Sequence, residues 1–215
     1  MIRETIVTTQ SSEGRIHIAP IGLIVEGGGF VIAPFRPSQT LENLRLNPHA
    51  VANYTDDVLI FAGCLTGRRD WPTRAADRIP GAVLTAALAH AELSVERMSE
   101  HPERPRFHCH VVHEANHAPF HGFNRAQAAV VEAAILVSRL HMLRMEKIER
   151  EIAYLTIAIE KTAGSRERQA WDWLMERVAA FKSDRATTSP SPLAGEGRGG
   201  VRTGQIGNRL IRGHG

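Results

Sequence analysis

The chain has 215 residues, of which 43% are hydrophobic, so it is long enough to bury a substantial core. Its formal charge is +3, and the segment from Ser183 onward, with five arginines against two acidic residues, accounts for all of it. The rest of the chain is electrically neutral, which removes the basic pI as an argument for nucleic-acid binding.

Targeting and redox signals are weak. No run of about 18 apolar residues occurs, and the N-terminus has no apolar stretch typical of a signal peptide. Cys64 and Cys109 are far apart and form no Cys-x-x-Cys motif, so neither a disulfide framework nor a cysteine zinc site is indicated. We therefore expect a cytoplasmic protein.

The N-terminal third predicts three strands in meander order. Ile2–Thr9 and Arg15–Val25 are β-branched and extended, and Phe30–Phe35 follows after the glycine-rich turn Glu26–Gly29. Glycines tolerate the positive φ that such tight turns require. This order is typical of an antiparallel barrel or sandwich.

A proline-punctuated turn joins the third predicted strand to a short helix that begins near Thr40 and ends before Pro48. Arg36, Ser38 and Thr40 lie at this turn. A cation, two hydroxyls and the free N–H groups of a helix start are the groups that bind a phosphate. Ordinary N-capping by Ser or Thr accounts for the same residues without a ligand.

The middle of the chain predicts more strands. Residues Ala50–Thr55 and Val58–Gly63 are strand-like, with the pair Asp56 and Asp57 as a solvated turn between them. Pro80 is expected to open a short helix. Two further strands follow at Glu92–Glu100 and Arg106–His113.

Histidines are concentrated late in this region. Six of the eleven fall between His101 and His121, and His108 and His110 would project from one strand face. Two imidazoles on one face are half of a zinc, copper or iron site. Because no carboxylate or thiolate is evidently placed to complete it, histidines on the outer face of a barrel strand are the simpler interpretation, and we predict no metal.

Beyond Gly122 the periodicity becomes helical. Asn124 is a good N-cap for a helix from Arg125 to about Met145, and two more amphipathic helices follow, the second from Ser165 to about Phe181. The segment 183–215 is rich in glycine and is predicted to be a disordered low-complexity tail. The predicted fold is α+β: an antiparallel split β-barrel over 1–122, then a three-helix subdomain over 123–182.

Several segments carry a family resemblance, in order and with matching spacing over about residues 1–181. They are Met1–Thr9, His17–Gly22, Ala33–Arg36, Ser38–Leu44, Asn53–Asp57, Gly122–Ala126 and Val131–Leu136. Together they resemble a family of uncharacterised archaeal and bacterial split-barrel flavoproteins, related in fold to flavin reductases and pyridoxamine phosphate oxidases.

The resemblance implies a homodimer that binds FMN at the subunit interface. Arg36, Ser38 and Thr40 would hold the phosphate with Asn43 near it, and Asn124 and Arg125 would reach the site across the dimer. The backbone of Ala19, Pro20, Ile21 and Gly22 and the segment Asn53, Tyr54 and Thr55 would line the flavin ring. The catalytic residues are unknown; His17 is a candidate proton donor near the ring, and a partly exposed surface histidine is the alternative.

The function expected on this basis is an FMN-dependent oxidoreductase acting on an unidentified small substrate. Gene neighbourhood links the family to organisms that use methanopterin-type one-carbon carriers. Two alternatives stay open: a non-catalytic flavin-binding protein for storage or sensing, and a histidine-based metalloprotein. A nucleic-acid module is the weakest reading, since aromatic residues make up only 6% of the chain. No membrane association is expected.

Overall fold

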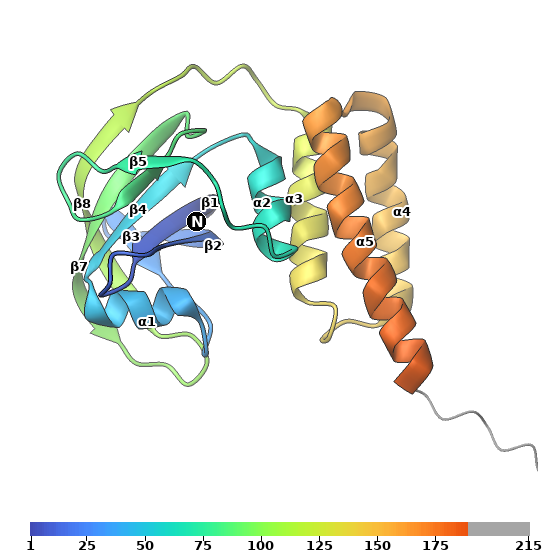
Figure 1. The fold of residues 1–215 in the computed structure, drawn as a ribbon, viewed down its shortest axis with the longest axis horizontal. Coiled ribbons are helices and arrows are strands. Elements are labelled where there is room, and N and C mark those ends of the chain that lie inside the picture. Colours follow the sequence, from blue (N-terminus) through green and yellow to red (C-terminus); the bar gives the residue numbers. More distant parts are fainter. Residues whose placement is uncertain (189–215) are drawn as a thin grey trace, which may run out of the picture.

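The computed structural model describes residues 1–188, and side chains as far as residue 185 (Figure 1). Its centre is a closed antiparallel barrel of six strands, in the order β1-β2-β3-β8-β7-β4. The strands are β1 (Ile2–Gln10), β2 (Ile16–Glu26), β3 (Gly29–Ile32), β4 (His49–Tyr54), β7 (Ala89–Ser99) and β8 (Arg106–Asn116). The predicted fold class, a split-barrel β-unit followed by helices, is confirmed.

The N-terminal meander forms as the sequence predicts. β1 pairs with β2 along its whole length, and β2 turns into β3 through Gly27 and Gly28, both at positive φ. Gly29 is needed for a different reason: a Cβ there would lie 2.3 Å from the carbonyl oxygen of Cys109 on β8. Two strands approach each other closely here, and only glycine fits.

The barrel interior is filled by alternate residues of its strands, as the two-residue period of a strand requires. Helix α1 (Gln39–Leu46) contributes Leu41 and Leu44 to this core. The interior side chains from the strands are Val7, Leu23, Ile32, Ala50, Ala52, Ala91, Leu93, Phe107 and Cys109.

The segment predicted as a strand at 58–63 is instead helix α2 (Val58–Leu65). Val58, Leu59 and Ala62 pack on the C-terminal helices, while Ile60, Phe61 and Cys64 pack on the outer face of the barrel. A helix buried on both sides is apolar all round, so a short segment of it cannot be told from a buried strand by periodicity.

Pro80 does not open a helix. The segment forms a small two-stranded sheet, β5 (Thr73–Ala75) with β6 (Ala82–Leu84), which lies against the outside of the barrel. Val83 and Leu84 are buried there with Ile6 and Val51 of the barrel. Packing against an existing sheet decides the conformation of these few residues.

Three helices follow the barrel: α3 (Arg125–Ser138), α4 (Met145–Thr162) and α5 (Ser165–Thr188). Their core includes Val130, Ile148 and Leu174, all fully buried. The first helix ends at Ser138, seven residues before the predicted end at Met145, because turns occupy most of residues 139–144.

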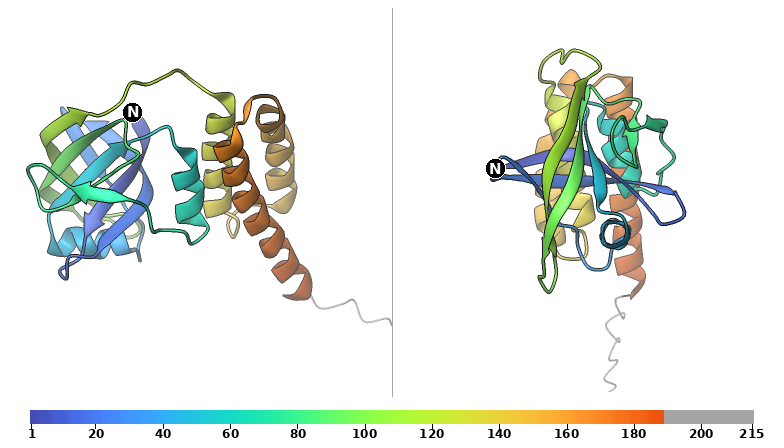
Figure 2. Two further views of the ribbon diagram at one scale, coloured as in Figure 1. Left: turned by 45° about the horizontal axis from the view of Figure 1, so that its top comes forward. Right: turned by 90° about the vertical axis from the view of Figure 1, so that its left-hand side faces the viewer.

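Figure 2 shows α2 between the barrel and these helices, with the extended segment after β8 as a second connection. The predicted division at residues 122 and 123 falls in that segment and stays a prediction. The predicted start of the tail at residue 183 is wrong, since α5 continues to Thr188. Residues 189–215 lie outside the described part of the chain. Among the described helices, none is both long and apolar enough to cross a membrane.

Candidate functional site

The turn after β3 leads directly into α1. Ser38 is the N-cap residue of this helix, and its side chain accepts a hydrogen bond from the backbone N–H of Leu41 at 3.3 Å. Capping by Ser38 leaves the amides of Gln39 and Thr40 as the first unpaired donors of the helix. The peptide bond between Arg36 and Pro37 is cis. The turn thus presents donors of the kind that bind an anion.

Arg36 lies at the outer side of this turn. Its guanidinium forms an ion pair with Glu100 and is 3.4 Å from the carbonyl oxygen of His101. Arg45, in the last turn of α1, contacts the same carboxylate at 3.2 Å. Two arginines against one carboxylate leave a net positive charge beside the turn, which favours an anionic ligand.

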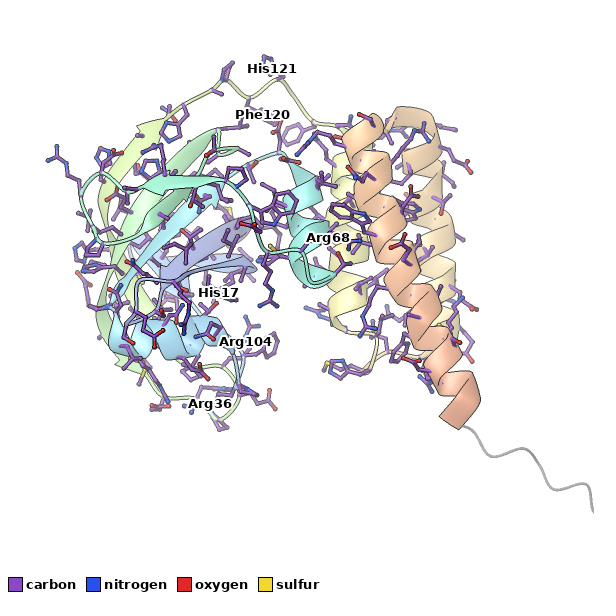
Figure 3. All side chains as sticks on the ribbon, in the orientation of Figure 1. His17, Arg36, Arg68, Arg104, Phe120 and His121 are labelled. Atoms are coloured by element: carbon purple, nitrogen blue, oxygen red, sulfur yellow. The ribbon has the colours of Figure 1, made fainter. Side chains whose placement is uncertain are left out.

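Arg104 is a residue of this region that sequence reasoning missed. Its Nε and Nη2 donate to the carbonyl oxygen of Ala33 at 2.9 and 2.7 Å, and its guanidinium stacks 4.4 Å from the ring centroid of Phe35. The amide of Arg36 in turn donates to the carbonyl oxygen of Glu103 at 2.8 Å. Arg104 therefore positions the turn, and Figure 3 shows it beside α1 together with Arg36. The sequence signal for this role was weak, because it showed only that Arg104 lies in the polar turn between β7 and β8.

Thr40 and Asn43 point into the protein. They are 3% and 1% exposed, and the Asn43 amide donates to Thr9 Oγ1 at 3.0 Å while its oxygen accepts from Gln39 at 2.9 Å. Within one chain these side chains fasten α1 to β1. Their predicted contact with a phosphate stays a prediction.

The segment Ala19–Gly22 lies on β2, and its side chains are partly buried. One edge of β2 pairs with β1, while its other edge pairs with β3 only over Ile24–Glu26. Within the described residues, the rest of that second edge has no partner strand. The backbone groups there that point away from β1 are therefore available to a ligand, and Pro20, which has no N–H, can offer only its carbonyl oxygen.

Asn53, Tyr54 and Thr55 are consecutive but differ in environment. Asn53 is fully buried; its amide donates to the Ile6 carbonyl at 3.1 Å, and its oxygen accepts from the amide of Leu84 at 2.8 Å. Asn53 joins β1, β4 and β6, so both polar atoms of its side chain already have hydrogen-bond partners within the protein.

Tyr54 and Thr55 instead line a cavity of about 360 Å³ at the end of β4, with residues Asp56, Leu88, Ala89, Asn116, Ala118 and Phe120. Burial, and then the nearby charge of Glu114, raises the pKa of Tyr54. The tyrosine therefore stays neutral at ordinary pH, so its hydroxyl keeps the proton that it can donate in a hydrogen bond.

His17 lies near the start of β2, opposite Thr9 of β1. Burial, and then the positive charge of Arg69, lowers the pKa of His17. The imidazole is thus neutral near pH 7, which makes it a better acceptor than donor of a proton. The role of His17 as a proton donor stays a prediction.

Asn124 and Arg125 begin α3, on the far side of α2 from the barrel (Figure 1). The Asn124 side chain accepts from the amide of Ala126 at 2.7 Å and donates to the carbonyl oxygen of Thr162 at 3.1 Å. It caps α3 and ties that helix to α4. Arg125 is exposed. The structure does not bring these two residues to the turn at Arg36 within one chain.

His108 and His110 do not form a metal site with a third ligand in the described residues. His108 Nδ1 is 3.1 Å from Arg97 and its Nε2 is 3.2 Å from Ser99 Oγ, while His110 contacts Glu96 at 3.2 Å. The guanidinium excludes a cation beside His108. Burial, and then Arg97, lowers the pKa of His108.

A closed six-stranded antiparallel barrel with a C-terminal bundle of three helices places the protein among α+β barrel proteins. Two models of a family of proteins of unknown function match the chain: the N-terminal domain of DUF447 over residues 3–118, and its C-terminal part over residues 124–176. The chain belongs to the DUF447 family. None of the curated proteins compared with the chain matches it.

Among solved structures, an FMN-bound DUF447 protein from Methanosarcina mazei is similar to this chain over both barrel and helices. It is 21% identical, with a TM-score of 0.73, over 82% of this chain and 94% of that protein. A 2-nitrobenzoate 2-nitroreductase of Pseudomonas fluorescens matches 53% of this chain and 64% of its own length, at 20% identity and a TM-score of 0.46. An NADH:FAD oxidoreductase of Streptomyces globisporus matches 53% and 70%, at 14% identity and a TM-score of 0.45.

Proposed function

We propose that this protein binds FMN and is a flavin-dependent oxidoreductase. The observation that carries the proposal is that the chain spans 94% of the FMN-bound family member from Methanosarcina mazei, barrel and helices alike, with a TM-score of 0.73. Shared family membership over both parts of the chain supports a shared ligand.

The residues of the turn after β3 fit the phosphate end of FMN. Arg36 supplies a cation, Ser38 a hydroxyl, and the start of α1 supplies amides whose dipoles favour an anion. For a phosphate to bind Arg36, the guanidinium must exchange its exposed carboxylate partner Glu100 for the ligand. Exposed ion pairs of this kind contribute little to stability, so the exchange costs little.

The unpaired edge of β2 at Ala19–Gly22 fits the ring of FMN. A flavin presents donors and acceptors along its pyrimidine edge, and the free edge of β2 offers backbone groups to it, with a carbonyl oxygen alone at Pro20. When bound, FMN supplies a centre that accepts and delivers hydride or single electrons. The protein holds and orients it and decides which molecules reach it.

We further propose that two chains form a dimer with FMN at their interface. Several apolar side chains of the described residues are exposed in the single chain, including Met1 at 71%, Ile2 at 62% and Phe123 at 100%. A second chain that covers them would bring Asn124 and Arg125 of one subunit toward the barrel of the other. The small substrate, including a methanopterin-type one-carbon carrier, stays a prediction.

The first experiment is the visible absorption spectrum of the purified protein, before and after denaturation, with and without added FMN. We expect a flavin band at one equivalent per chain, released intact on unfolding. A protein that remains colourless after incubation with FMN and gel filtration contradicts the proposal.

Turnover separates the enzyme from a passive flavin binder. The FMN-loaded protein is mixed with NADH or NADPH under anaerobic conditions, and bleaching of the flavin is followed against free FMN at the same concentration. We expect reduction faster than that of free FMN. If protein-bound FMN and free FMN are reduced at the same rate by both NADH and NADPH, the protein is better explained as a storage or sensing protein.

A further inference from the structure

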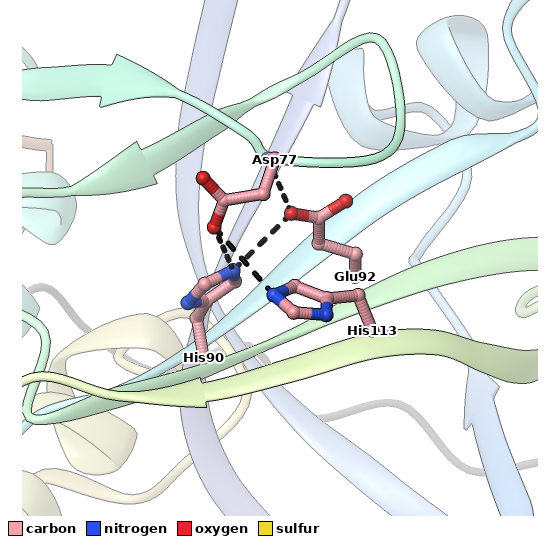
Figure 4. Close-up of side chains that lie close together, drawn as sticks. All are labelled: Asp77, His90, Glu92 and His113. Carbon is pink, nitrogen blue, oxygen red and sulfur yellow. Dashed lines mark hydrogen bonds and ion pairs between the residues drawn. The ribbon is translucent and has the colours of Figure 1, made fainter.

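Four side chains on the outside of the barrel converge at a place that the flavin proposal does not use (Figure 4). His90 and Glu92 lie on β7, both fully buried, and His113 lies opposite Glu92 on β8. Asp77 comes from the loop between β5 and β6 that covers this face. One ligand atom from each of the four lies within 4.8 Å of every other.

Three of the separations are close to the edge length of a coordination tetrahedron. His90 Nε2 is 3.3 Å from Glu92 Oε1 and 3.7 Å from Asp77 Oδ2, and His113 Nε2 is 3.6 Å from the same Asp77 oxygen. An ion with four bonds of about 2.0–2.2 Å to nitrogen and oxygen holds its ligands about 3.3–3.6 Å apart. The cluster is thus already spaced for one ion.

The hydrogen bonds around His90 fix which of its nitrogens faces the cluster without a proton. Arg74 Nη2 is 3.2 Å from His117 Nε2, and a guanidinium can only donate, so His117 Nε2 is an acceptor. His90 Nδ1 lies 2.8 Å from the same atom and therefore donates to it. A neutral His90 then points the bare lone pair of its Nε2 at two carboxylate oxygens.

Three electron-rich atoms facing one another repel unless a metal ion or a proton lies between them. A second partner that fixes the tautomer of a ligating histidine is the usual arrangement around protein metal sites. His117 has this position, and its ring lies nearly parallel to that of His90, with centroids 5.0 Å apart and planes inclined by 12°.

The carboxylates are also held in place from outside. Glu92 accepts hydrogen bonds from the amides of Asp77, Arg78 and Ile79 at 2.5, 2.8 and 2.9 Å, which wraps the β5–β6 loop around it. Asp77 turns one oxygen toward Arg74 at 3.5 Å and the other toward the two histidines. These contacts orient the groups before any ion arrives.

We propose that Asp77, His90, Glu92 and His113 bind one divalent transition-metal ion, with zinc as the best match. Two imidazoles and two carboxylates suit zinc and its neighbours in the first transition row, whereas magnesium and calcium prefer oxygen alone. The ion joins the β5–β6 loop to strands β7 and β8, so its role is to hold that loop on the barrel.

The test is zinc binding by the tag-free, FMN-loaded full chain after removal of metal with a chelator. Zinc chloride is titrated calorimetrically, and the melting temperature is measured with and without it. His113→Ala and Asp77→Ala remove ligands that are 30% and 45% exposed, so these variants are expected to fold. His110→Ala, an exposed histidine of the same strand, is the matched control.

We expect one zinc ion per chain and a higher melting temperature in the wild type and in His110→Ala. Loss of either ligand should weaken zinc binding by about tenfold or more, since even second-shell losses reach that size. Equal affinity in all four proteins, or no zinc binding by the wild type, overturns the proposal. The second result would mean that a proton on His90 holds the two carboxylates together.

Discussion

At the residue scale, Arg36 is the side chain on which the phosphate assignment depends. It combines an exposed guanidinium, a fixed backbone and a neighbouring helix start. Arg104 fixes the backbone of the same turn through Ala33. We therefore expect Arg36 to supply the cation for the phosphate and Arg104 to hold the backbone of the turn in position.

Arg36→Ala should weaken FMN binding about ten- to a hundredfold, because a charge-assisted contact to phosphate is worth about 1.5–3 kcal/mol. Fluorescence quenching of FMN on titration with protein measures the affinity. Arg45→Ala is the control, since Arg45 contacts the same Glu100 but lies at the other end of α1. Equal losses in both variants would indicate a general charge effect, and no loss in Arg36→Ala would remove this residue from the site.

His17 should make the fold less stable in acid. Its pKa is lowered in the folded chain by burial and Arg69, so the unfolded chain takes up a proton at a higher pH. His17 therefore does not lower the free energy of unfolding at a pH well above its ordinary pKa of about 6.5. The full loss of stability is present below the lowered pKa that His17 has in the folded chain.

Urea unfolding at pH 7.5 and pH 5 tests whether His17 lowers the stability of the fold in acid. His17→Gln should lose less stability than the wild type between the two values, while His141→Gln, in the exposed loop before α4, should behave as the wild type does. A larger acid loss in His17→Gln would show that the charged imidazole is favoured in the fold.

At the element scale, α2 is the helix through which barrel and bundle are joined. Asp57 caps it by accepting from the amide of Leu59 at 3.2 Å and also forms an ion pair with Arg166 at the start of α5. That contact, followed by burial acting in the opposite sense, leaves the pKa of the Arg166 guanidinium raised. The aspartate expected to be a solvated turn residue thus connects two helices.

Two substitutions separate the roles of Asp57. Asp57→Asn keeps a capping oxygen and loses the charge, so it should cost about 0.5–1 kcal/mol, given that the arginine is 56% exposed. Asp57→Ala loses the cap as well and should cost about 1 kcal/mol more. Arg166→Met in combination with each completes a double-mutant cycle by urea unfolding; a coupling near zero would show that the ion pair adds nothing.

At the scale of the whole molecule, barrel and helices should unfold together. Leu59 faces the bundle and Ile60 faces the barrel, so neither core is complete without α2. Trp171 and Trp173 report on the bundle, whereas Trp71 packs against both cores. Cys109 reports on the barrel, since burial raises the pKa of its thiol to about 12 and keeps it unreactive in the folded state.

In a Cys64→Ala, Trp71→Phe background, thiol labelling and tryptophan fluorescence should give the same urea midpoint. Leu59→Ala and Ile60→Ala should each lower both midpoints, by about 2–5 kcal/mol in stability, because each removes a buried side chain from a shared element. Separate midpoints, or a variant that moves only one of them, would show that the two parts unfold independently.

The amino-acid sequence by itself determined the β meander, the two long strands near the end of the barrel and the three C-terminal helices. The last barrel strand and the helices have a period that depends only on neighbouring residues: alternation in β8, and spacings of three and four in α4 and α5. The same is true of Ser38 and Asn124, since capping is a local interaction.

Only the tertiary structure decided that residues 58–65 are a helix and residues 82–84 a strand, because both are buried on surfaces supplied by distant parts of the chain. It also decided that the side-chain amides of Asn53 and Asn43 form hydrogen bonds inside the fold, and that Asp77 lies next to His90, Glu92 and His113. These four residues span 37 positions of the sequence with no regular spacing, and they meet because a loop folds back over two paired strands.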